Sequence, residues 1–269
     1  MNSGNLNLSN VYYCTKKFKN YNNVIIHYTG SYTSIFEHNL ADILTNCIIS
    51  FYEEKLVERL INYNYFYFDY FEKAKIKDEC LNLLNDTNTH EFSFRKESLW
   101  LCTYNYLHEH KKVILQGFVN FRLSPYIKSL DYATDISVNK FIIEREYNEF
   151  IALLKLYIHS KPISKKIVHL IYINKESILL DENKNIIPMN ENNFDAKYLS
   201  DISFSSNDIT LNTLLNIIPK EIHLHLISDE DDEFIETLKQ IFEDRIQICT
   251  DCNICKTYKL IKQELTQKV

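Results

Sequence analysis

Residues 219–255 read PKEIHLHLISDEDDEFIETLKQIFEDRIQICTDCNIC, and this stretch decides how the C-terminal part of the chain folds. Apolar residues at every second position predict a strand over residues 219–227, and the acidic stretch that follows predicts a helix. Residues 245–249 predict a second strand. A strand–helix–strand unit normally forms a right-handed crossover with parallel strands, so both strands should end at the same edge of a sheet.

Three cysteines begin at the end of the second strand, with two residues between neighbours: Cys249, Cys252 and Cys255. Thiolates at this spacing can wrap a metal, either zinc or an iron–sulfur cluster. A closed tetrahedral site needs a fourth ligand, and the best candidate in the chain is His225, because its strand should end beside the Cys249 strand. A cysteine from a second subunit is another option. Two alternatives stay open. One is a dithiol exchange pair, Cys252 with Cys255 or Cys249 with Cys252, and the other is three reduced thiols without a ligand.

The pattern of the whole chain predicts an α+β protein. A β-hairpin is expected from residues 11–14 and 24–28, and helices from residues 36–61, 69–85, 96–110 and 118–160, with a break at Pro125. Short β-branched runs at 167–173, 178–180 and 186–187 then predict a meander, followed by a helix at 206–218. We therefore expect a hairpin and mainly helical body over residues 1–160, a mixed-sheet α/β unit ending in the cysteine cluster over residues 163–255, and a basic tail over residues 256–269.

Three details of the helical body are specific enough to test. In the first helix, apolar residues at helical spacing predict one buried stripe that includes Ile43, Cys47 and Phe51 and resumes at Val57. Asp69 is placed to cap the next helix. Gly117 is expected to allow a sharp change of direction before the long helical region.

Composition excludes several classes of protein. No run of 18 apolar residues is present and the first ten residues are polar, so neither a membrane span nor a secretory signal is expected. An odd number of cysteines, seven, indicates a reducing cytoplasm with buried thiols. Residues 228–244 hold eight acids and one lysine, a net of −7 (1 − 8), so the rest of the −6 chain sums to about +1, which disfavours a nucleic-acid binder. Phosphate-loop, zinc-protease, esterase and kinase motifs are absent, so an enzyme is the less favoured class.

The acidic residues 229–243 allow two interpretations. Asp229, Asp232 and Glu233 are close enough on a helix to bind a divalent ion. Acidic residues also gather in the first turn of a helix because the macrodipole favours them there, and this interpretation predicts a solvated surface that can recruit a basic partner.

Arg122 lies next to Asn120 on an otherwise aromatic helical face. A buried arginine needs a carboxylate, and the candidates are Glu144, Glu146 and Glu149. The alternative function for this pair of residues is recognition of an anion such as phosphate.

Three stretches together resemble the YtxC-like family of sporulation proteins: GFVNFRL at 117–123, EREYNEFI at 144–151 and CTDC at 249–252. The resemblance runs over residues 113–255, whereas the first ninety residues match only in general character. It implies a cytoplasmic protein connected with sporulation, and it supplies no catalytic residues. The leading interpretation is therefore a non-enzymatic factor that acts through an unidentified protein partner, with neither membrane nor nucleic acid. The alternative is a metal- or redox-responsive protein that uses the terminal cysteines.

Overall fold

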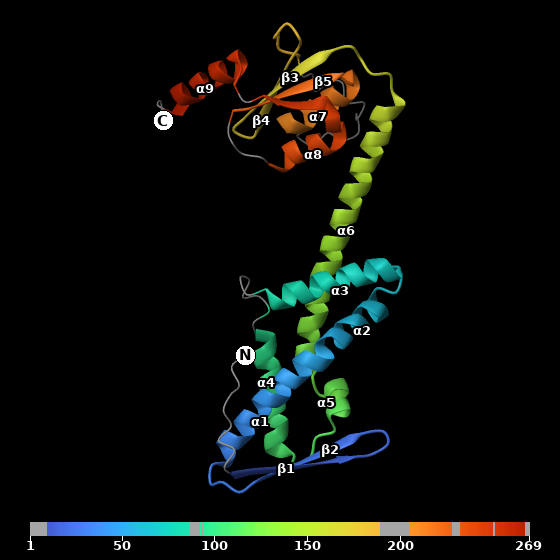
Figure 1. Cartoon of the computed structure of the whole chain (residues 1–269), viewed down its shortest axis with the longest axis vertical. Coiled ribbons are helices and arrows are strands. Elements are labelled where there is room, and N and C mark those ends of the chain that lie inside the picture. Colours follow the sequence, from blue (N-terminus) through green and yellow to red (C-terminus); the bar gives the residue numbers. More distant parts are fainter. Residues whose placement is uncertain are drawn as a thin grey trace, which may run out of the picture. The chain divides into compact units, whose positions relative to one another are not determined.

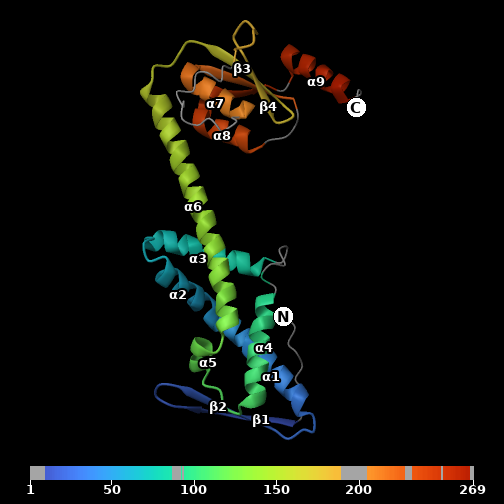
Figure 2. The same cartoon turned by 180° about the vertical axis from the view of Figure 1, so that it is seen from behind.

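The computed structural model describes residues 10–86, 92, 94–188, 205–227, 232–249 and 251–266, with side chains of the last helix described up to residue 262. The chain divides into two compact units, Met1–Glu144 and Arg145–Val269 (Figures 1 and 2). The division falls inside helix α6 (Ser124–Ser160), whose side chains enter the core of both units. The helical pattern of the sequence runs through this point without interruption, which is why sequence analysis places the boundary at the end of the helix.

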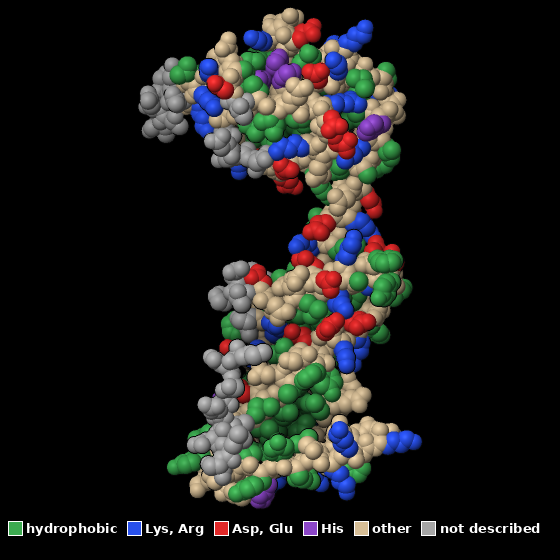
Figure 3. All heavy atoms as spheres, viewed as in Figure 1, with side chains coloured by type: hydrophobic (Ala, Val, Ile, Leu, Met, Phe, Trp, Pro, Cys, Tyr) green, Lys and Arg blue, Asp and Glu red, His purple; other side chains and the backbone are tan. Residues whose placement is uncertain are grey.

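Unit 1 begins with an antiparallel hairpin of β1 (Val11–Lys17) and β2 (Asn22–Tyr28), which confirms the predicted hairpin. Its helices are α1 (Thr33–Ile48), α2 (Glu54–Asn64), α3 (Tyr70–Asn85), α4 (Phe94–Glu109), α5 (Leu115–Phe121) and the first part of α6. Both strands are exposed along most of their length. Figure 3 shows hydrophobic side chains gathered on the surface next to this hairpin. The predicted α+β class is thus confirmed by unit 1 together with the sheet of unit 2.

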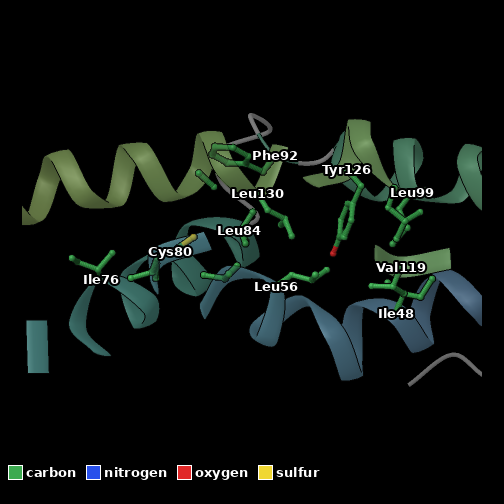
Figure 4. Close-up of a cluster of buried hydrophobic side chains, with 14 of the residues drawn as sticks. Ile48, Leu56, Ile76, Cys80, Leu84, Phe92, Leu99, Val119, Tyr126 and Leu130 are labelled. Carbon is green, nitrogen blue, oxygen red and sulfur yellow. The ribbon is translucent and has the colours of Figure 1, made fainter. Parts of the chain in front are cut away.

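The core of unit 1 is built from side chains of all its helices (Figure 4). A carboxylate lies within it, because the π-helical turn Ile49–Glu53 between α1 and α2 turns Glu53 inward. Oε2 of Glu53 accepts hydrogen bonds from the hydroxyl of Tyr126 at 2.5 Å and from Nε of Arg95 at 3.1 Å. Burial and the nearby Glu53 raise the pKa of Tyr126, so its hydroxyl stays protonated and donates. The buried charge of Glu53 is therefore paired and hydrogen-bonded, as buried charges require.

The predicted stripe of the first helix was wrong at two positions, and the π-helical turn accounts for the second of them, Phe51. Ile43 and Phe51 are 41% and 68% exposed, while Ala41, Thr45 and Ile48 are buried instead. The wider turn shifts the helical phase, so the stripe resumes at Val57 as predicted, but Phe51 points outward. Gly117 also differs from expectation. It lies inside α5 and has no positive φ, and the chain turns after Arg122, where Pro125 fits the first turn of α6.

Helix α3 starts with the cap that the sequence predicts. Oδ1 of Asp69 accepts from the amide of Glu72 at 2.8 Å, and Oε2 of Glu72 accepts from the amide of Asp69 at 2.9 Å. Replacing Asp69 by Ala should lower the free energy of unfolding of unit 1 by about 1 kcal/mol, because the amide of Glu72 in the first turn loses its acceptor. Urea unfolding can be followed by fluorescence of Trp100, the one tryptophan of the chain, which lies on α4. Asp69→Ser should retain most of the stability, and equal loss in both variants would contradict the cap.

Unit 2 contains a four-stranded mixed sheet in the order β4–β3–β5–β6. β3 (Ile167–Ile173) pairs antiparallel with β4 (Glu176–Leu180) and parallel with β5 (Glu221–Leu226), which pairs parallel with β6 (Ile246–Cys249). This confirms the parallel pairing predicted for the last two strands. The third strand expected at 186–187 is a single bridge between Leu180 and Ile186. The helices are α7 (Ser206–Ile217), α8 (Glu233–Phe242) and α9 (Asn253–Thr266).

The two faces of this sheet are covered unequally. Side chains such as Val168, Leu170 and Leu224 form one face and pack against the end of α6, α7 and α8. The opposite face has a much smaller buried cluster, in which the first turn of α9 supplies Ile254 and Cys255. The other buried members are Ile171, Leu180 and Ile227. The rest of α9 extends away from the sheet in both views (Figures 1 and 2). Among the described helices, none is long and apolar enough to cross a membrane.

Candidate metal centre

Four potential ligand atoms lie close together on the face of the unit 2 sheet that has the smaller buried cluster. His225 is near the end of β5 and Cys249 ends β6, and the parallel register places them directly opposite each other. Cys252 directly precedes α9, and Cys255 lies in its first turn. The sulfur atoms of the three cysteines and a ring nitrogen of His225 all lie within 4.8 Å of one another. The structure therefore brings together all four ligands that the sequence suggested.

The distances between these atoms have the scale of a tetrahedral site. Sγ of Cys255 lies 3.7 Å from Sγ of Cys252 and 3.9 Å from Sγ of Cys249. Nδ1 of His225 lies 3.3 Å from Sγ of Cys255 and 3.5 Å from Sγ of Cys252. A tetrahedral zinc ion with usual bond lengths separates two sulfur ligands by about 3.8 Å, and a sulfur from a nitrogen by about 3.5 Å. The four residues can therefore bind one metal ion such as zinc.

The local fold favours an ionised sulfur at Cys252. The amide of Cys255 donates to Sγ of Cys252 at 3.5 Å, a contact that stabilises a thiolate. The N-terminus of α9 also contributes partial positive charge near Cys252 and Cys255. His225 and Cys255 are each only 1% exposed, so water has little access to the inner side of the site.

The surroundings shift the pKa of three of these groups: His225, Cys249 and Cys252. Burial, with a contribution from His169 and His223, lowers the pKa of His225 to about 4, so its ring is neutral and keeps a lone pair. Burial and hydrogen bonds with the other two thiols raise the pKa of Cys249 to about 11. Burial opposes ionisation of Cys252, yet hydrogen bonds, chiefly from the amide of Cys255, bring its pKa below the ordinary value. A metal must therefore displace protons from thiols but none from His225.

Zinc affinity should consequently rise with pH. Below its pKa of about 11, Cys249 holds a proton that competes with zinc, and this competition weakens as pH rises. His225 is already neutral above its pKa of about 4, so it adds nothing to the pH dependence in this window. With at least one proton released, the Kd for zinc should fall at least about tenfold per unit between pH 6 and pH 8. Competition with a chromophoric chelator at pH 6, 7 and 8 measures this, and a constant Kd would contradict thiolate ligation.

Arg122 and Asn120 form no comparable site. The side chain of Arg122 is exposed, and within the described part of the chain it makes no ion pair with the expected glutamates. The reason is α6, which continues without folding back, so Glu144 lies about 30 Å along the helix from its start. Oδ1 of Asn120 accepts a hydrogen bond from Nη1 of Arg59 at 2.9 Å. The buried ion pair expected for Arg122 was wrong. Among the described residues of unit 1, it is Arg95, with a side chain 11% exposed, that pairs with the buried carboxylate of Glu53.

Residues of the acidic stretch cap helix α8 and occupy its first turn. Oδ1 of Asp232 accepts from the amide of Ile235 at 3.2 Å and caps α8, and Glu233 and Glu236 occupy its first turn. These positions agree with the macrodipole interpretation. Asp229 lies outside the described residues. Among the residues that are described, the His225 and cysteine cluster is the one group with the arrangement of a metal site.

One residue at this site, His169, is not predicted from the sequence. Nδ1 of His169, on β3, lies 3.1 Å from Nε2 of His225. The parallel register places His169 opposite His223, so both side chains lie on the same face of the sheet as His225. The alternating histidines of residues 223–225 gave part of this signal, but the position of His169 follows only once the pairing of β3 with β5 is known.

Comparisons with known proteins give the chain its family. The model of the YtxC-like family matches residues 38–247, so the match starts earlier than the expected resemblance and ends just before Cys249. "Uncharacterized protein YtxC" of Bacillus subtilis (strain 168) is 25% identical over 136 residues, which are 50% of this chain and 47% of that protein. The match thus spans about half the length of this relative. No solved structure matches the chain. Because the family model covers well over half of its residues, the chain belongs to the YtxC-like family.

Proposed function

We propose that this chain is a zinc-binding protein in which one structural zinc ion is held by Cys249, Cys252, Cys255 and His225. The observation that carries this proposal is the spacing of the four ligand atoms, all within 4.8 Å of one another and separated as in a tetrahedral site. Four protein ligands leave no position for a substrate or water, which is the arrangement of structural zinc sites. The centre therefore supports a non-enzymatic role.

Zinc would stabilise the face of the unit 2 sheet that has only a small hydrophobic cluster. Its ligands come from the ends of β5 and β6 and from the start of α9, so one ion ties three elements together. The buried cluster on that face has only five members among the described residues. Small cores are commonly supplemented by a structural metal. The compact ligand set also favours a single ion over an iron–sulfur cluster, which contains several irons and needs wider spacing between its thiolates.

The direct test is the metal content of the purified protein. Protein prepared anaerobically without chelators should contain about one zinc per chain and little iron, as determined by inductively coupled plasma mass spectrometry. Cys14→Ser, a change of an exposed cysteine on the hairpin, serves as the control and should keep the zinc. Fully folded wild-type protein that neither retains nor takes up zinc would refute the proposal.

A redox role is the second candidate, and the geometry of Cys252 and Cys255 favours it. Their sulfurs lie 3.7 Å apart, and the pKa of Cys252 lies below the ordinary value, as is typical of an attacking thiol. Metal-free protein that forms a reversible Cys252–Cys255 disulfide in glutathione buffers would support this role. Zinc that protects both thiols from alkylation would support the structural centre instead.

For the cellular role, we infer a cytoplasmic protein that acts in sporulation through contacts with a protein partner. The resemblance to the family implies the process. Exposed aromatic side chains at the corner between α2 and α3 support contacts with a protein, because large exposed apolar patches commonly mark interaction sites: Tyr63, Phe66, Tyr67, Tyr70 and Phe71. Deletion of the gene should reduce the number of heat-resistant spores, and a version with Tyr63, Phe66 and Tyr70 changed to Ser should fail to restore it. Normal spore numbers in the deletion strain would contradict this role.

A further inference from the structure

We propose that His169 is a positioning residue for the metal centre. Its ring accepts a hydrogen bond from His225 and so determines which nitrogen His225 offers to the metal. This inference rests on the proposed zinc centre. It concerns a residue that hydrogen-bonds to a ligand without being one. His169 lies on β3, which supplies none of the four ligands.

The two ring nitrogens of His225 face different partners. Nδ1 faces the thiols of Cys252 and Cys255 at 3.5 and 3.3 Å, whereas Nε2 lies 3.1 Å from Nδ1 of His169. A neutral imidazole has one N–H and one lone pair. If Nδ1 binds the metal with its lone pair, Nε2 must carry the hydrogen and needs an acceptor. Among the described residues, Nδ1 of His169 is the acceptor within hydrogen-bonding distance.

The burial of His225 makes this acceptor important. Its side chain is 1% exposed, so water cannot readily take over the hydrogen bond if His169 is lost. The histidine would then be free to adopt the opposite tautomer, with a hydrogen on Nδ1 and no lone pair toward the thiols. Histidine ligands of metals generally donate their other N–H to a fixed partner, and loss of that partner typically weakens metal binding 10–100-fold.

The fold places His169 for this role through the pairing of β3 with β5. His225 lies opposite Ile171, so His169 is its diagonal neighbour on the same face, with the two rings 5.3 Å apart and nearly parallel (28°). His223 provides a natural comparison. It lies on the same face, its ring is 5.1 Å from that of His169, and its Nε2 is 3.7 Å from a carboxylate oxygen of Glu221. It makes no hydrogen bond with His225 among the described contacts.

The experiment compares the zinc affinity of four full-length proteins by chelator competition: wild type, His169→Leu, His169→Asn and His223→Leu. His169→Leu should raise the Kd for zinc 10–100-fold. His223→Leu, the matched control, should change the Kd less than about threefold, since it removes no partner of a ligand. Asn carries an oxygen where His169 has Nδ1, so His169→Asn should restore most of the affinity. Equal Kd values for wild type and His169→Leu would overturn the inference.

A spectroscopic readout separates positioning from general stabilisation. In the zinc-loaded wild type, long-range 1H–15N NMR correlations should show His225 protonated at Nε2 and His169 with an unprotonated Nδ1. A metal-bound Nε2 of His225, or a hydrogen on Nδ1 of His169, would overturn the inference even if His169→Leu failed to fold. Wild-type protein that binds no zinc would instead refute the proposed function, so the two failures are distinguishable.

Discussion

Replacing Cys255 by Ser is expected to reduce the zinc content from about one ion per chain to nearly none and to destabilise unit 2. Cys255 is the central ligand, since its sulfur lies within 3.9 Å of both other sulfurs and 3.3 Å from Nδ1 of His225. Ser is similar in size but is a poor ligand for zinc at neutral pH, so three ligands remain. With free zinc a thousandfold above the wild-type Kd, the wild type gains about 4 kcal/mol of stability that the variant lacks.

Thermal unfolding of both proteins with and without a chelator measures this difference. The chelator should lower the midpoint of the wild type to that of Cys255→Ser and leave the variant unchanged. Limited proteolysis should then cut next to α9 in the variant and in the chelated wild type, because α9 loses its attachment to β5 and β6. Cys14→Ser should behave as the wild type throughout. A chelator effect of equal size on the wild type and on Cys255→Ser would place the metal elsewhere.

The second large effect is expected in unit 1, where Glu53→Ala should lower the free energy of unfolding by about 3–5 kcal/mol. The side chains of Arg95 and Glu53 are only 11% and 5% exposed, so the change leaves a cation inside the core without its partner. It also removes the acceptor of the Tyr126 hydroxyl, which is fully buried (Figure 4). Both losses act on the same core, and their costs are not expected to add independently.

Glu54→Ala is the matched control for this prediction. Glu54 is adjacent in sequence and forms an ion pair with Lys77 at 2.9 Å, but its side chain is 62% exposed. Exposed ion pairs contribute little to stability because water and salt screen them. Urea unfolding followed by the fluorescence of Trp100 should therefore shift strongly for Glu53→Ala and hardly at all for Glu54→Ala. Equal shifts would mean that the buried pair contributes no more than a surface pair.

Much of this fold could be predicted from local sequence patterns. The hairpin, the start of α3 at Asp69 and the parallel pairing of β5 with β6 each follow from spacing, capping or crossover rules that act over short distances. His225 could be named as a ligand for the same reason, because parallel strands joined by a helix end at one edge. The cysteine spacing supplied the remaining three ligands.

What could not be predicted depends on contacts between distant residues. The inward turn of Glu53 depends on a π-helical turn that shifts the phase of the helix, and its partners Arg95 and Tyr126 come 42 and 73 residues later. The position of His169 beside His225 depends on the register of two strands 56 residues apart. Arg122 was expected to pair because it lies among aromatic residues, but the orientation of that face is set by how α5 packs.

X-ray absorption spectroscopy at the zinc K-edge tests the central claim most directly, because it identifies the atoms bound to the ion. We expect three sulfur atoms at about 2.3 Å and one nitrogen at about 2.0 Å. The His225→Ala variant should lose the histidine signal and keep the sulfur shell if it still holds zinc. A wild-type spectrum with only oxygen and nitrogen around the zinc, or with four sulfur atoms, would contradict a centre built from Cys249, Cys252, Cys255 and His225.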